Sequence, residues 1–84
     1  MIYTLNILRS AQKQLAKIDH QDQFDIISAI NNLADNPRPI GCKKLSGRSA
    51  WRLRIGVYRI IYEIYDDQLL VLVVEIGHRK EVYR

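Results

Sequence analysis

Apolar and polar positions in the first half of the chain predict one strand followed by two helices. Residues Ile2–Ile7 are apolar and β-compatible, which predicts a first strand. Ser10 is a typical helix N-cap, and Asp19 can cap a second helix directly after the first. Apolar residues follow each cap at helical spacing: Ala11, Leu15 and Ile18 in the first helix, and Phe24, Ile27, Ile30, Leu33 and Ala34 in the second. The prolines in Asn36–Pro39 end the second helix, because each disfavours helical geometry at the residue before it.

After Gly41 the pattern changes from helical to alternating, which predicts strands. Lys43–Leu45 and Ala50–Ile55 read as one strand interrupted by a turn at Gly47. The strand pattern resumes over Tyr58–Tyr65, with a tight turn at Asp66-Asp67-Gln68 behind it.

The last predicted strand, Leu69–Ile76, is apolar almost throughout, so we expect it to be central in the sheet and covered on both faces for much of its length. Gly77 is expected to end it, leaving a short polar tail. The element order β-α-α-β-β-β predicts an α+β fold, with a helical hairpin packed on a mostly antiparallel four-stranded sheet. Eighty-four residues are enough for one domain spanning 1–84.

Charge and composition narrow the kind of partner. Thirteen Lys and Arg against nine Asp and Glu give a formal net charge of +4, which favours a polyanionic partner such as nucleic acid or an acidic protein segment. The single Cys42 cannot form an internal disulfide, which fits a reducing compartment. No apolar run approaches the ~20 residues of a membrane span, and the N-terminus lacks a secretory signal pattern. We therefore expect a cytoplasmic protein.

Several familiar chemistries have no motif in this sequence. It contains no glycine-rich phosphate loop and no CxxC or HExxH spacing. His20 and His78 fall in different predicted elements without other ligands beside them, so we expect neither a bound metal nor a cofactor. Cys42 has no evident His or Asp partners, and its pattern is more typical of a buried or incidental thiol than of a nucleophile.

Basic residues on the predicted strands are the strongest candidates for function. Arg52 and Arg54 share one face by the two-residue period, and Arg59 lies early in the next strand. Within the predicted strands, the acids are Glu63 and Glu75. The alternative is a solvated face, on which arginine stems cover apolar surface. A cationic face suits phosphates, because a guanidinium can hold two oxygens in parallel. The tyrosines of the same strand, Tyr58, Tyr62 and Tyr65, are expected mainly to pack, with base stacking as the alternative.

Three stretches, GCKKLSG, WRLRIGVYRIIYEI and VLVVEIGHRKEVYR, resemble the RelE/ParE superfamily of bacterial toxin–antitoxin toxins, and the resemblance runs over nearly the whole chain. It implies a RelE-like fold. RelE-like members of the superfamily enter the ribosomal A site and cut messenger RNA there without a metal. The resemblance assigns their active-site positions to Arg52, Arg54, Arg59, Arg79 and Tyr83. Further RNA contacts are expected from Lys43, Lys44, Arg48 and His78. Some relatives have Lys at the positions of Arg52 and Arg54.

The resemblance also supplies a mechanism, in which the 2′-hydroxyl of RNA attacks the adjacent phosphate. We expect Tyr83 to act as the base, because nearby guanidinium groups favour its phenolate. Arg79 fills the family's acid position, but an arginine donates protons poorly, and the adjacent His78 is the alternative acid. Neighbouring residues in extended chain point opposite ways. We therefore expect Arg79 to face the substrate and His78 to face away.

Three functions fit the resemblance. The first is a ribosome-dependent endoribonuclease, favoured because ParE-like gyrase inhibitors generally lack the complete basic set. The second is a ParE-like inhibitor of DNA gyrase. The third is a non-toxic relative that binds an antitoxin and, through it, operator DNA. All three imply a cognate antitoxin with an acidic, partly disordered segment that covers or displaces the cationic face.

Overall fold

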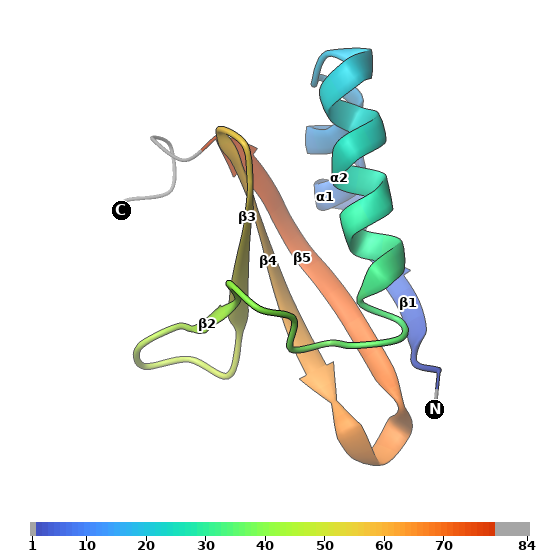
Figure 1. The fold of residues 1–84 in the computed structure, drawn as a ribbon, viewed down its shortest axis with the longest axis vertical. Coiled ribbons are helices and arrows are strands. Elements are labelled where there is room, and N and C mark those ends of the chain that lie inside the picture. The colour runs from blue at the N-terminus through green and yellow to red at the C-terminus, as the bar shows by residue number, and fades with distance from the viewer. Residues whose placement is uncertain (1, 79–84) are drawn as a thin grey trace.

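A five-stranded sheet with two helices on one side makes up the computed structural model, which describes residues 2–78 (Figure 1). The strands are β1 (Thr4–Ile7), β2 (Lys43–Lys44), β3 (Trp51–Ile55), β4 (Tyr58–Tyr65) and β5 (Leu70–His78). The helices are α1 (Arg9–Ala16) and α2 (His20–Asn32), and a short 3-10 turn covers Asp66–Gln68. The strands lie in the order β1-β5-β4-β3-β2. The pair β1–β5 is parallel and the other pairs are antiparallel, so the expected α+β class and mostly antiparallel sheet are confirmed.

The sheet has one strand more than the four expected. Lys43–Lys44 does not continue into Trp51–Ile55 as one interrupted strand, but pairs with it as an antiparallel neighbour. The chain reverses between them at Gly47, whose φ of +74° lies in the left-handed region that glycine adopts without a Cβ penalty. The Leu45 amide closes the reversal by donating to the Ala50 carbonyl at 2.9 Å. At the other end of the chain, β1 begins at Thr4 rather than at Ile2.

Strand β5 is central, between β1 and β4, as its apolar sequence predicted. Every residue of β5 is at least partly covered, but burial is more complete on the helix side, where buried Val71 and Val73 alternate with partly exposed Leu72. The expected end of the strand at Gly77 was wrong, because β5 continues to His78. Gly77 lies directly opposite Arg59 of β4, where the missing side chain leaves room for a large neighbour.

One of the two expected helix caps is found in the structure. The Leu8 amide donates to the Val73 carbonyl at 2.9 Å, so the chain stays on the sheet up to Leu8 and α1 begins at the next residue. Ser10 therefore lies inside α1, and Leu8 takes the N-cap position expected for Ser10. Asp19 does occupy the N-cap of α2, although its side chain makes no capping hydrogen bond.

Helix α2 faces the sheet with a different stripe from the one expected. Ile26, Ile30 and Leu33 are buried, whereas Phe24 and Ile27 are 69% and 43% exposed. The buried residues recur at i, i+4 and i+7, so they form one face by themselves, and Phe24 and Ile27 lie outside it. Together with residues from α1 and the three central strands they form the core: Ala11, Leu53, Ile60, Tyr62, Val71, Val73 and Ile76. No helix within residues 2–78 has the length and apolar character to cross a membrane.

A polar network ties the loop after α2 to the turn between β4 and β5 and to the start of β3. The Arg38 guanidinium donates to both carboxylate oxygens of Asp66, at 3.3 and 2.9 Å. The Tyr3 hydroxyl donates to the same carboxylate at 2.6 Å. Arg38 also lies over the Trp51 ring, 5.2 Å from its centroid. Arg38 thereby holds Trp51, the residue that directly precedes the candidate Arg52 in β3.

The Asp66 carboxylate makes the stability of the fold depend on pH. Hydrogen bonds from Arg38 and from Tyr3 hold the pKa of Asp66 below its ordinary value. A carboxyl group with a lowered folded pKa stabilises the fold above its unfolded pKa of about 3.9, and this contribution is lost as the pH falls through the folded value. We expect the difference in unfolding free energy between the wild type and Asp66→Asn to become smaller as the pH falls from about 3.9 through the lower folded pKa. Urea unfolding of both proteins at neutral and at acidic pH measures the gap. An equal gap at both pH values would contradict the assignment.

Candidate functional site

The candidate arginines lie on the face of the sheet that points away from the helices. Leu53 and Ile60 belong to the core between sheet and helices. Successive residues of a strand point to opposite faces, so their neighbours Arg52, Arg54 and Arg59 point to the other face. The sequence predicted a shared face for Arg52 and Arg54, and the strand register adds Arg59 to it, because Arg54 and Arg59 are directly paired.

The register brings these guanidinium stems close together. Directly opposed residues of an antiparallel pair have Cβ atoms about 4.5–5.5 Å apart, which applies to Arg54 and Arg59. Arg52 lies two residues before Arg54, or about 7 Å along the strand. Like charges placed directly opposite each other destabilise a sheet. A negative group beside both side chains, from the protein itself or from a ligand, offsets that cost.

The three arginines differ in how much of each side chain reaches solvent. Arg59 is only 5% exposed, Arg52 is partly buried, and Arg54 is exposed. The Nε atom of Arg52 is buried and has no hydrogen-bond partner among the residues that the structure describes. Burial limits the rotamers of Arg52 and Arg59, so their charges are held in place before any ligand arrives. Arg54 is the member of the set that a ligand reaches most directly.

The additional basic residues predicted to contact RNA divide between the two faces. Lys43 is paired with Arg52 and therefore shares the arginine face. Lys44 is paired with Trp51 and points to the other face, where its Nζ donates to the Arg48 carbonyl at 3.4 Å. Arg48 is exposed in the turn between β2 and β3. Lys43 thus extends the arginine row to the edge strand.

A β-bulge in the pairing of β4 with β5 decides which side chains of β5 reach the arginine face. The register shifts between the pairs Ile61–Glu75 and Tyr62–Val73, so Val74 has no opposite partner. By strict alternation Glu75 would face the helices with Val73, but the bulge turns it to the arginine face. Glu63 shares that face through its pairing with Leu72. Sequence reasoning missed the placement of Glu75, because no residue pattern marks the bulge.

The same bulge sends His78 to the helix side of the sheet. His78 is paired with Tyr58, and the two rings meet edge to face with their centroids 5.7 Å apart. The structure therefore separates His78 from Arg52, Arg54 and Arg59. Arg79 and Tyr83 lie outside the described residues.

The tyrosines of β4 have separate roles. Tyr62 is fully buried, and its hydroxyl donates to the Pro37 carbonyl at 2.8 Å, while burial raises the pKa of the phenol above its usual value. Tyr65 is exposed and donates to the Glu63 carboxylate, which raises the pKa of Tyr65. Tyr62 is thus a core residue, and Tyr58 lies against His78. Within residues 2–78, no group of three or more His, Cys, Asp or Glu side chains is placed to hold a metal ion.

Comparison with known proteins finds the same architecture and one family. The family model described as ParE toxin of type II toxin-antitoxin system, parDE, matches residues 5–83. A RelE-like toxin protein from Escherichia coli is 27% identical over 82 residues, covering 95% of this chain and 86% of the relative. Toxin RelG from Mycobacterium tuberculosis is 27% identical over 88 residues, covering 100% of this chain and 99% of the relative.

Among solved structures, the archaeal RelE–RelB complex from Pyrococcus horikoshii contains a similar chain. It superposes with a TM-score of 0.84 at 22% sequence identity, covering 94% of this chain and 97% of that one. The expected RelE-like arrangement of helices and sheet is therefore confirmed.

Proposed function

The chain belongs to the ParE toxin family of type II toxin–antitoxin systems, within the RelE/ParE superfamily, and we propose that it acts there as a ribosome-dependent endoribonuclease. In this role it enters the ribosomal A site in the cytoplasm, cuts the messenger RNA and stops translation. The observation that carries the proposal is the arginine face: Arg54 and Arg59 are directly opposed, with Arg52 on the same side of the sheet. Gyrase inhibition requires no chemistry on a phosphate, whereas clustered guanidinium groups supply the positive charge that phosphate chemistry needs.

The arginine face supplies the electrostatic part of RNA cleavage. The 2′ oxygen attacks the adjacent phosphorus, the bond from phosphorus to the 5′ oxygen breaks, and the products are a 2′,3′-cyclic phosphate and a 5′-hydroxyl. The phosphorane formed on the way carries more negative charge than the starting phosphodiester. Preorganised cations stabilise that added charge. The partly buried Arg52 and the buried Arg59 hold the phosphate in position, and the exposed Arg54 closes over it.

The two proton transfers are assigned to the tail. We propose that Tyr83 takes the proton of the 2′-hydroxyl, and that Arg79, at the family's acid position, hydrogen-bonds the leaving 5′ oxygen and passes it a proton that solvent then replaces. Lys43, on the arginine face, is placed to hold a neighbouring phosphate of the message. This scheme uses no metal ion or cofactor.

We further propose that the chain is held inactive by a cognate antitoxin. The archaeal relative was solved as a complex of RelE with RelB. With a net charge of +4, this chain suits an acidic segment that covers or displaces the cationic face. Gyrase inhibition is the second candidate function, because the matching family model carries the ParE description.

Primer extension and a gyrase assay together decide between the two functions. A defined messenger held in a stalled ribosome with an empty A site is incubated with the purified protein, and its 5′ ends are mapped. A new end inside the A-site codon, without inhibition of DNA supercoiling by gyrase, is the expected result. Inhibited supercoiling with an intact message would instead assign the chain to the gyrase inhibitors.

A further inference from the structure

Helix α1 carries a row of cations on the side opposite the core. Arg9, Lys13 and Lys17 recur every four residues, and all are exposed. Ala11, the buried residue of the helix, lies on its opposite side. A step of four residues rises about 6 Å and turns about 40° beyond a full circle, so the row runs about 12 Å along the helix and drifts around it. Residues 9–17 contain no acid to neutralise it.

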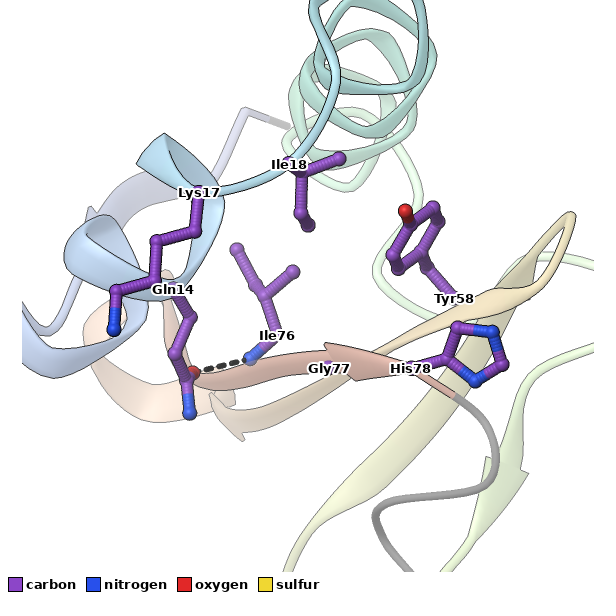
Figure 2. A pocket seen from close by; sticks show the side chains of 7 residues that line it. All are labelled: Gln14, Lys17, Ile18, Tyr58, Ile76, Gly77 and His78. Atoms are coloured by element: carbon purple, nitrogen blue, oxygen red, sulfur yellow. Dashed lines mark hydrogen bonds between the residues drawn. The ribbon is translucent and has the colours of Figure 1, made fainter.

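A pocket of about 420 Å³ opens at the Lys17 end of this row (Figure 2). Its volume falls within the range of about 300–1,000 Å³ that is typical of ligand sites. The pocket lies between α1 and the ends of β4 and β5, and the figure shows the Tyr58 and His78 rings on one wall with Gln14 and Lys17 on the other. Ile18 and Ile76 supply apolar lining. Gln14 is fixed there because its Oε1 accepts a hydrogen bond from the Ile76 amide at 2.8 Å.

Charge, aromatic rings and the lack of apolar anchors select the ligand class for this surface. An amphipathic peptide helix binds through apolar residues that enter an apolar groove. The outward side of α1 offers polar side chains instead, and the exposed Phe24 and Ile27 belong to α2. A row of exposed cations suits the regularly repeated negative charges of a phosphate backbone. An aromatic-walled pocket with an amide at its edge matches an unstacked nucleobase.

We propose that α1 and this pocket form a second RNA-binding surface. Arg9, Lys13 and Lys17 hold the phosphate backbone of a structured RNA, and one unpaired base of that RNA enters the pocket and stacks on Tyr58 or His78. This surface lies on the helix side of the sheet, away from Arg52, Arg54 and Arg59. The biological partner of this surface is a loop of ribosomal RNA, and this part of the inference rests on the proposed ribonuclease function. The messenger RNA occupies the arginine face at the same time.

The cationic row is tested by removing two charges. In Lys13→Gln/Lys17→Gln, we expect the dissociation constant for a short RNA hairpin to rise by about tenfold. The slope of log affinity against log salt is expected to fall by about 1.4–1.8, as for two lost phosphate contacts. The control is Gln21→Glu/Asn31→Asp, which changes the net charge equally at exposed positions of α2. If both variants bound the hairpin equally weakly, the loss of affinity would come from net charge and not from the position of the row. That result would overturn the proposal.

The pocket is tested with a hairpin whose loop carries 2-aminopurine, a fluorescent base quenched by aromatic stacking. We expect the wild type and Arg54→Ala to quench it, and His78→Ala and a Tyr58→Leu variant to quench it less. Quenching that is lost in Arg54→Ala but kept in His78→Ala would place the base on the arginine face and overturn the pocket assignment. Circular dichroism of each variant establishes that it is folded.

The ribosomal role is tested separately from RNA binding. Sedimentation with ribosomes and A-site cleavage are measured for the wild type and for Lys13→Gln/Lys17→Gln. Weaker sedimentation of the variant, but not of the α2 control, supports the role. A wild type that cleaves the message and a variant that sediments equally well would overturn this inference while the ribonuclease function stands. A wild type that neither sediments nor cleaves would instead refute the proposed function, and the hairpin results would still decide the RNA surface.

Discussion

Replacing Arg54 with alanine is expected to lower the rate of message cleavage by about two to three orders of magnitude. This is the usual effect of removing one preorganised group that stabilises developing charge in a transition state. Arg54 is exposed, so the substitution leaves the core intact and changes the free energy of unfolding by no more than about 0.5 kcal/mol. Single-turnover cleavage on ribosomes with an empty A site gives the rate, and urea unfolding gives the stability.

Arg54→Lys is the matched variant for this prediction. Lysine keeps the charge but cannot hold two phosphate oxygens in parallel. We expect a cleavage rate between those of the wild type and Arg54→Ala. An alanine variant that cleaves at the wild-type rate would remove Arg54 from the catalytic set. An alanine and a lysine variant that are equally slow would mean that the paired geometry of the guanidinium matters and its charge alone does not.

The elements that the sequence predicted best are those in which local preference and burial agree. Tyr58–Tyr65 forms a strand over the expected residues, and Asp66–Gln68 forms the expected turn. The shared face of Arg52 and Arg54 could also be predicted, because it depends only on the two-residue period within one short strand.

Properties that depend on how separate segments meet could not be predicted. The bulge at Val74 reverses the alternation of β5 and turns Glu75 to the arginine face. A bulge is set by pairing with β4, and the nearly uniform apolar sequence of β5 contains no sign of it. Likewise, α2 has apolar residues on more than one side, and contact with the sheet selects Ile26 rather than Ile27 for burial.

Replacing Ile60 with alanine is expected to cost about 2–5 kcal/mol of unfolding free energy. Ile60 is 0% exposed and lies at the centre of the sheet, paired with Leu53 on one side and Ile76 on the other. Its removal leaves a cavity that packed neighbours fill only in part. Natural domains are stable by about 5–15 kcal/mol, so the loss is a large fraction of the total. The shift in the urea midpoint of unfolding measures it.

Ile40→Ala is the control, because it makes the same chemical change at a fully exposed position. We expect that variant to stay within about 0.5 kcal/mol of the wild type. Equal losses in the two variants would contradict the packing assigned to Ile60. Ile60 directly follows Arg59 and points to the opposite face of the sheet, so Ile60→Ala leaves every cation of the arginine face in place. Its cleavage rate should therefore follow the folded fraction, whereas the rate of Arg54→Ala should be low even when the protein is fully folded.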